Sequence, residues 1–395
     1  MLGAFWQSLP DILNGLYRIF ICPSQLNTDY IAIGGLGATL WNSALFIMFQ
    51  LLIICLAKID FTANILAATI LTSAFAFQGT NLLNSLPLFI GAYLYIWTAK
   101  LSLAANLSTI FFSSVLAPLV SVTMFGLNLP LYISIPLAII IGLVTGMIIP
   151  LLASKFITFH KGYNLFNIGF VAGIIGLVFV SFFRLFGYKI NTVNILSSLN
   201  LTSFIIILIL LFLFMMIIGF FLNDKSLKNY PELLTEKGNR STDFNALYGS
   251  GLTLFNMGLM GLVCFIYLLL IGAPFNGIVL CSVLSIVGFA AIGIHPWNAI
   301  PLMLGVYLAT SLNPGLFSPT TAVTTAIFAT GISAVTGIFG VLAGLFAGFL
   351  HASIVPSLSV LHGGLNQYNN GFSLGFVAAI LVPILTFLQA KRKNN

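Results

Sequence analysis

The sequence predicts an all-α integral membrane protein: two inverted structural repeats of about five or six transmembrane segments each, plus a connecting helix, with discontinuous or re-entrant helices. Three observations predict this fold class. Of the 395 residues, 59% are hydrophobic and only 5% are charged. Apolar runs of about 20 residues, long enough to cross a bilayer, recur along the chain. The second part of the chain also repeats motifs of the first.

The composition excludes a soluble domain, which carries roughly 25% charged residues. Mean hydropathy is +1.12, and the apolar runs do not alternate with polar residues as the strands of a membrane barrel do. The net charge of +7 comes from basic residues scattered at segment ends, so no nucleic-acid partner is expected. The four cysteines are far apart and suggest packing residues. We expect no cofactor and no metal.

The chain divides into five regions by composition. These are an N-terminal interfacial segment (1–30), a first membrane repeat (31–190), a connecting helix with a cytoplasmic loop (191–247), a second membrane repeat (248–390) and a basic tail (391–395). The first region is not a clean apolar run, and "FWQSLPDILNGLYRIF" is typical of an amphipathic interfacial helix.

Three pairs of segments carry the internal repeat. "GLGATLWN" (35–42) matches "GSGLTLFN" (249–256), "NSLPLFIGAYL" (84–94) matches "NAIPLMLGVYL" (298–308), and "HKGYNLFNIGF" (160–170) matches "HGGLNQYNNGF" (362–372). A pattern of glycine followed by an aromatic residue and asparagine occurs at the beginning and end of each half. The halves are therefore interpreted as duplicates.

The distribution of basic residues predicts the orientation. With six crossings in each half and one between them, one side carries Lys58, Lys100, Lys155, Lys161, the basic residues of 225–240 and the tail, and the other carries Arg18, Arg184 and Lys189. The richer side is expected to be cytoplasmic. Equivalent positions of the two halves are then separated by an odd number of crossings, so the second half is inverted in the membrane relative to the first. If the third segment of each half is re-entrant, this parity changes.

Neutral polar side chains are the candidates for a binding site. From residue 244 to 390 there is no Asp, Glu, Lys or Arg, so acid–base catalysis lacks its groups and the protein is not expected to be an enzyme. The four motif copies contribute Asn42, Asn167, Asn256 and Asn369, with Asn164, Asn366, Thr39 and Thr253 as a second layer. Amides and hydroxyls suit a small neutral polar solute. The alternative is that these asparagines cap helices and bind neighbouring helices together.

Two further segments suggest broken helices. Asn84 and Asn298 each precede a proline at the start of a third segment, which is either an ordinary cap or the start of a discontinuous helix. Residues 313–331 contain prolines and glycine together with Thr320 and Thr324. Irregular backbone at this depth is tolerated where it lines a cavity, so we expect a broken helix near the centre; a short tilted helix is the alternative.

Other residues are assigned to the ends or walls of a pathway. His160 and His362 are expected at two entrances. Their ordinary pKa of about 6.5 would allow gating by pH, and the alternative role is simple hydrogen bonding at the membrane interface. The aromatic residues predicted beside the pathway are Phe166, Phe255 and Tyr368.

Two resemblances follow from these motifs. Through "HKGYNLFNIGFVAG", "IGIHPWNAIPLMLGVYLA" and "HGGLNQYNNGFSLGFVAA" the whole chain resembles a family of bacterial multi-pass membrane proteins of unknown function. "GLTLFNMGLMGL" (251–262) and "IPLMLG" (300–305) resemble short motifs of urea transporters. That likeness implies inverted repeats and a pore that passes a small amide between aromatic residues, although this chain lacks an acidic residue near the motifs.

The sequence therefore predicts a transporter or channel in the inner membrane for a small neutral polar solute, urea-like or other, with an Asn/Thr-lined site between the repeats. The expected partners are membrane lipids and the solute; self-association stays open. Two alternatives are a flippase for lipids or polyprenyl carriers and a non-transporting membrane subunit. The first would need a lateral groove with a basic rim, and the second would not need symmetric polar motifs.

Overall fold

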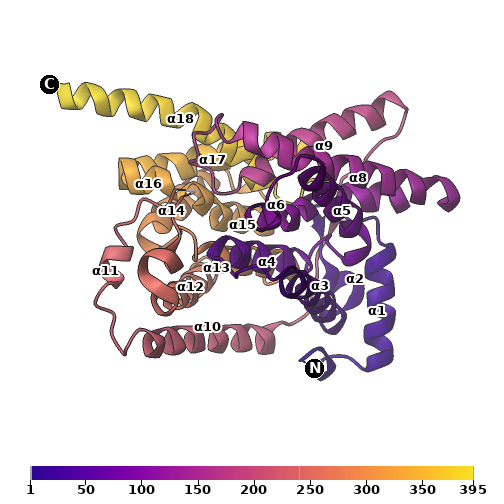
Figure 1. Cartoon of the computed structure of the whole chain (residues 1–395), viewed down its shortest axis with the longest axis horizontal. Helices are drawn as coiled ribbons and strands as arrows, with labels where there is room; N and C mark the ends of the chain where they lie inside the picture. The colour runs from indigo at the N-terminus through magenta and orange to yellow at the C-terminus, as the bar shows by residue number, and fades with distance from the viewer. Residues whose placement is uncertain (1, 240, 395) are drawn as a thin grey trace.

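The protein is an all-α membrane protein. A computed structural model describes residues 2–239 and 241–394, and 75% of the chain is helical. Within these residues, nine helices are long and apolar enough to cross a membrane. This confirms the predicted multi-pass class. The helices surround a buried centre in which α4 (Ala63–Phe75) and α13 (Gly277–Phe289) lie side by side (Figure 1).

The helices form two sets of similar order. The first comprises α3 (Leu36–Ala57), α4, α5 (Leu82–Thr98), α6 (Leu103–Phe112), α7 (Ala117–Ser121), α8 (Leu131–Phe156) and α9 (Asn167–Leu185). The second comprises α12 (Phe244–Leu270), α13, α14 (Pro296–Leu312), α15 (Pro319–Ala329), α16 (Ser333–Phe339), α17 (Val341–Leu361) and α18 (Asn369–Asn394).

The remaining elements precede or join these sets. They are α1 (Leu9–Ile21), α2 (Tyr30–Gly34), α10 (Thr202–Leu222) and α11 (Tyr230–Leu233), the short helical turns η1 (Leu2–Phe5) and η4 (Pro314–Leu316), and the parallel pair β1 (Asn27–Thr28) and β2 (Asn194–Ile195). In α1, the predicted interfacial segment, Ile12, Gly15, Leu16 and Ile19 are buried on one face, and the helix packs against α2 and α3.

The second segment of each set is a shorter helix than the recurring apolar runs of about 20 residues predict. The apolar segments 62–78 and 275–292 contain helices of only 13 residues, α4 and α13. At about 1.5 Å per residue, such a helix spans roughly 20 Å, less than the hydrocarbon thickness. The reason lies in their ends: Thr62 and Asn276 cap the starts, and the chain turns directly after Phe75 and Phe289.

The fourth segment of each set is a broken helix, as predicted for residues 313–331. In the first set, α6 continues through η2 (Ser113–Leu116) and α7 into the π-helical turn η3 (Val122–Gly126). In the second set, α15 continues through η5 (Thr330–Ile332) into α16. The most apolar stretches of these two broken helices are 83% and 78% buried, compared with 17% for α10. The broken helices therefore belong to the centre, and α10 belongs to the lipid-facing periphery.

Small residues let α5 pack closely on α8 and α14 pack in the same way on α17. A Cβ on Gly146 would lie 2.2 Å from the Leu88 carbonyl oxygen, and one on Gly348 would lie 2.1 Å from the Leu302 carbonyl oxygen. Close approach of backbones through glycine is a common way to join membrane helices, because apolar side chains gain little by leaving lipid.

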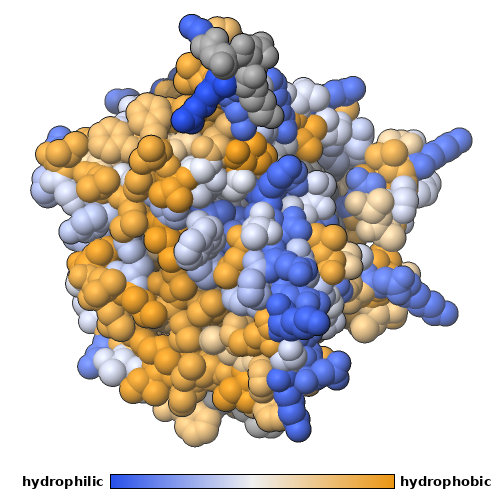
Figure 2. Space-filling model, turned by 90° about the vertical axis from the view of Figure 1, so that its left-hand side faces the viewer, coloured by the Kyte–Doolittle hydropathy of each residue, from blue (hydrophilic) through white to orange (hydrophobic). Residues whose placement is uncertain are grey.

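One side of the molecule carries the polar connection between the two sets. Figure 2 shows the side where α11 and the end of α18 lie, with a hydrophilic strip beside apolar surface. The connection exposes Asp224, Lys225, Lys228, Glu232 and Lys237. Charged residues of this kind belong outside the hydrocarbon, so this strip marks one membrane face.

Candidate functional site

The two histidine-containing motif copies meet at the centre of the molecule. The Asn164 side-chain amide donates to the Gly371 carbonyl oxygen at 2.9 Å, and the Asn366 amide donates to the Gly169 carbonyl oxygen at 3.0 Å. Each asparagine also accepts a backbone N–H two residues ahead, at 2.9 Å, from Phe166 or Tyr368. The copies thus clamp the starts of α9 and α18 to each other reciprocally.

Each copy also contains a buried histidine–asparagine pair. Nε2 of His160 lies 2.8 Å from Oδ1 of Asn167, and Nε2 of His362 lies 2.8 Å from Oδ1 of Asn369. In both rings Nδ1 accepts a backbone N–H, which places the proton on Nε2 and makes the asparagine oxygen the acceptor. Both histidines were predicted at entrances; both are fully buried instead, because each ring packs against the motif's own helix start.

Six aromatic rings, three from each set, pack around this clamp. Phe166 lies 4.6 Å from Tyr368 and 4.7 Å from Phe289, measured between ring centroids. The cluster consists of Phe75, Phe112, Phe166, Phe289, Phe328 and Tyr368, and is called the aromatic cluster below. Phe166 and Tyr368, which were both predicted to lie beside a pathway, pack against each other in this cluster. Phe255 lies elsewhere, against Tyr230 at 5.0 Å.

A small cavity of about 80 Å³, called the polar cavity below, borders the aromatic cluster at Phe328. Its polar lining includes Gln78, Thr324, Thr325, Gln367, Asn369 and Asn370. With about 30 Å³ per water in the liquid, it has room for roughly three waters or one very small solute. Oε1 of Gln78 and Oγ1 of Thr325 are buried there without a hydrogen-bond partner among the described residues.

The polar cavity lies where the two motif copies differ. In the first copy, Nδ2 of Asn167 donates to the Ala153 carbonyl oxygen on α8 at 3.0 Å. In the second, Nδ2 of Asn369 makes no such bond, and Val355 on α17 lines the cavity instead. The cavity therefore presents a free amide donor beside two free oxygen atoms.

Further hydrogen bonds hold the polar cavity in shape. Gln367 accepts from the Thr80 hydroxyl and donates to the Gln78 carbonyl oxygen, which ties the start of α18 to the turn after α4. Oδ1 of Asn370 lies 3.1 Å from Nε2 of His351, whose Nδ1 lies 3.1 Å from the Ser373 hydroxyl. The lining is thus positioned by groups from both sets.

Asn42 and Asn256 occupy equivalent structural positions away from the polar cavity. Asn42 donates to the carbonyl oxygens of Ala76 and Thr80 at 2.9 and 2.8 Å, and Asn256 donates to those of Ala290 and Ile294, both at 2.8 Å. They satisfy carbonyls at the ends of the short helices α4 and α13. Thr39 and Thr253 bond to the carbonyl oxygens of Gly35 and Gly249 in their own helices.

Asn84, Asn298 and Thr320 also have defined partners. Asn84 completes a reciprocal cap with Asn81 at the start of α5 and donates to Gly79 and Ser121. Asn298 donates to the Gly293 carbonyl oxygen at 2.9 Å. Thr320 accepts from Asn276 at 2.9 Å. Of the predicted residues, the structure brings Thr324 and Asn369 together in the polar cavity, with Tyr368 beside them.

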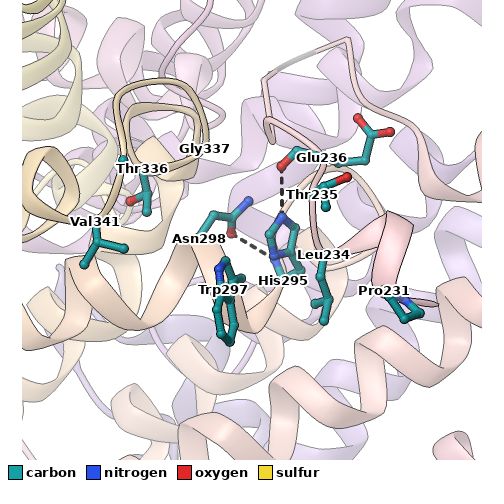
Figure 3. A pocket seen from close by; sticks show the side chains of 11 residues that line it. Pro231, Leu234, Thr235, Glu236, His295, Trp297, Asn298, Thr336, Gly337 and Val341 are labelled. Atoms are coloured by element: carbon teal, nitrogen blue, oxygen red, sulfur yellow. Dashed lines mark hydrogen bonds between the residues drawn. The ribbon is translucent and has the colours of Figure 1, made fainter. Parts of the chain in front are cut away.

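A second, larger cavity of about 500 Å³ lies at the other end of the broken helix α15–α16. It is formed by a strap, residues 230–238, together with Asn298 and Trp297 of α14 and Thr336 of α16. Figure 3 shows His295 reaching from the start of α14 to the strap, where Nε2 lies 3.0 Å from the Glu236 carbonyl oxygen. Burial lowers the pKa of His295 to about 4, so the ring is neutral at pH 7.

Among the described residues, Asp29 is the one Asp, Glu, Lys or Arg side chain that is buried. Its carboxylate accepts backbone N–H groups from Ile31 at 2.8 Å and from Ser197 and Gly277 at 3.0 Å. Burial raises the pKa of the carboxyl group, while these N–H groups act in the opposite direction. Asp29 thereby joins the start of α13 to the segment that follows β2.

The lining residues Gln78, Gln367 and Asn370 were not predicted. A signal for two of them exists in the sequence, because the second motif copy has Gln367 and Asn370 where the first has Leu165 and Ile168. Within the described residues, no group of three or more His, Cys, Asp or Glu side chains is placed to hold a metal ion, and all four cysteines are free.

The chain belongs to a known protein family. Residues 9–185 and 222–387 match the model of the family described as "Protein of unknown function (DUF1576)", which covers well over half of the chain. This confirms the first resemblance. The stretch between the two matched regions, 186–221, includes all of the peripheral helix α10 except its last residue. No curated protein and no solved structure matches the chain.

Proposed function

We propose that the protein is a membrane transporter or channel for a small neutral polar solute, which binds in the polar cavity. The observation that carries this proposal is the set of buried groups without partners in that cavity, Oε1 of Gln78 and Oγ1 of Thr325, beside the free amide of Asn369. A buried polar group without a partner costs about 1–3 kcal/mol, so several in one small cavity favour a ligand that satisfies them.

The lining supports a neutral solute. Among the residues that the structure describes, no charged side chain lines the polar cavity, so an ion would lack a counter-charge there. The Gln78 oxygen accepts, the Asn369 amide donates, and the Thr325 hydroxyl does either. A solute with both donors and acceptors, and no net charge, fits this set.

The arrangement of the two sets supports a transporter of two inverted repeats. The paired hydrogen bonds of Asn42 and Asn256, and of Asn164 and Asn366, are equivalent. From their shared centre, α9 and α18 run in opposite directions (Figure 1). Transporters with inverted repeats commonly bind substrate at the repeat interface, beside discontinuous helices.

The path we propose follows the broken helix α15–α16. Thr324, Thr325 and Phe328 of α15 line the polar cavity, and Thr336 of α16 lines the strap cavity. The aromatic cluster separates the two and acts as the barrier. The Lys-rich connection, which includes the strap, supports a cytoplasmic position for the strap cavity by the positive-inside rule, and we propose the inner membrane as its location.

Flux into liposomes tests this function. The purified protein is reconstituted, and shrinkage and reswelling are followed by stopped-flow light scattering with formamide, urea and glycerol. We expect faster flux than in empty liposomes for at least one solute, and about a tenfold reduction in Thr325→Val, which removes the unpartnered hydroxyl.

The matched control is Thr98→Val. Thr98 is exposed and its hydroxyl bonds only within its own helix, so this variant keeps the flux of the parent protein. Folded wild-type protein that leaves the flux of every solute at the level of empty liposomes would rule the proposal out.

A further inference from the structure

The Tyr368 hydroxyl is a polar group for which the fold provides no partner. The side chain is 1% exposed, and Oη has no hydrogen bond to any residue in the described part of the chain. The ring is nevertheless firmly placed: its centroid lies 4.6 Å from that of Phe166 and 5.4 Å from that of Phe75, and a Cβ on Gly169 would lie 2.9 Å from its Cβ. The ring therefore cannot easily turn to find water.

The first motif copy shows that the fold does not need this hydroxyl. Phe166 occupies the equivalent position, with the same backbone N–H bond to the asparagine two residues before it. The packing role of the ring is served equally by phenylalanine. A hydroxyl in the same surroundings without a partner only disfavours the folded state.

Tyr368 lies next to the residues that line the polar cavity. Its two neighbours in sequence, Gln367 and Asn369, both line the polar cavity, and its ring contacts Phe328, which also lines it. Tyr368 thus stands at the boundary between the cavity and the aromatic cluster. A solute that leaves the cavity gives up the bonds made there when it reaches the rings.

We infer that Tyr368 is a specificity-determining residue, whose hydroxyl bonds the solute as it passes from the polar cavity into the aromatic cluster. The inference rests on the proposed function. The hydroxyl replaces part of the hydration that a polar solute loses between the rings, so it lowers the barrier for hydrogen-bonding solutes.

The test combines thermal unfolding with liposome flux for Tyr368→Phe. We expect a raised Tm, because an unpartnered buried hydroxyl is removed, together with about a tenfold loss of flux of the solute that wild type transports. A purely structural role would move both measurements in the same direction or leave flux unchanged.

Tyr30→Phe is the matched control. Tyr30 is also fully buried, but its hydroxyl lies 2.8 Å from the Ser24 hydroxyl and accepts from Asn81 at 3.2 Å. We expect loss of the Tyr30 hydroxyl to lower Tm and to leave flux per folded molecule unchanged.

Two results would overturn the inference: a lower Tm in Tyr368→Phe, which would reveal a partner for the hydroxyl, or undiminished flux. Absence of flux in wild type would instead remove the proposed function, and the inference with it. Flux in wild type that persists in Tyr368→Phe would remove the inference alone.

Discussion

The two motif copies at the centre of the molecule are built alike but differ in one functional respect. Both clamp the opposite helix through Asn164 or Asn366, and both bury a histidine–asparagine pair. Within the described residues, only the first copy uses its second asparagine amide in a further hydrogen bond, from Asn167 to the Ala153 carbonyl oxygen. The second leaves Asn369 facing the polar cavity. The shared bonds are structural, and the difference locates the candidate site.

The largest expected effect concerns the shared clamp. Asn164→Ala and Asn366→Ala each leave a buried carbonyl oxygen and a backbone N–H without the side chain that bonds them. We expect each to lower the free energy of unfolding by about 2–4 kcal/mol, and by similar amounts. Chemical denaturation in detergent measures this.

Asn106→Ala is the control for the clamp variants. Asn106 is half-buried and its side chain bonds only to Ser102 in its own helix start, so its loss changes little. A large inequality between the two clamp variants would show that the copies are not structurally equivalent.

A smaller effect concerns the helix starts of α5 and α14, where Asn81 and His295 occupy matching positions. His295 has a pKa of about 4 in the folded protein because it is buried, whereas a histidine in the unfolded chain has a pKa of about 6.5. Below pH 6.5 the unfolded chain therefore binds a proton that the folded chain does not. Stability is lost as pH falls from about 6.5 to about 4.

His295→Asn, which installs the residue of the first helix start, removes this titration. We expect the loss of stability between pH 7.5 and pH 4.5 to shrink by about 2 kcal/mol, with some loss at pH 7.5 from the missing bond to Glu236. Thermal unfolding at the two pH values checks this. An unchanged pH dependence would mean that His295 binds its proton equally well in the folded and the unfolded chain.

The membrane class and the repeated motifs could be predicted because hydropathy and repetition are local properties of the sequence. The partners of the motif asparagines could not. Asn164 bonds to Gly371, and Asn42 bonds to Thr80, so the acceptors are backbone carbonyls brought close by folding. A carbonyl leaves no signature in the residue type that carries it.

The short length of helices α4 and α13 could not be predicted from the sequence either. An apolar run shows that a segment avoids water, but it does not distinguish a segment that faces lipid from one that is buried inside the protein. These two helices pack closely against each other in the centre: a Cβ added to Gly288 of α13 would lie 3.1 Å from the Cβ of Ile70 in α4. The apolar segment therefore continued past the point where the helix ends.

The polar cavity, by contrast, had a sequence signal. Gln367, Tyr368 and Asn370 stand where the first copy has Leu165, Phe166 and Ile168. The asparagines that the two copies share hold the fold, whereas Gln367 and Asn370, where the copies differ, line the cavity.

The central claim is that the polar cavity, where the copies differ, binds the solute. The most direct test measures stability and liposome flux together for Asn167→Ala and Asn369→Ala. Asn167 makes one more hydrogen bond, so its loss should cost about 1 kcal/mol more stability. Asn369 faces the cavity, so its loss should reduce flux per folded molecule about tenfold more. This opposite ranking is the predicted result; flux that follows stability in both variants would contradict it.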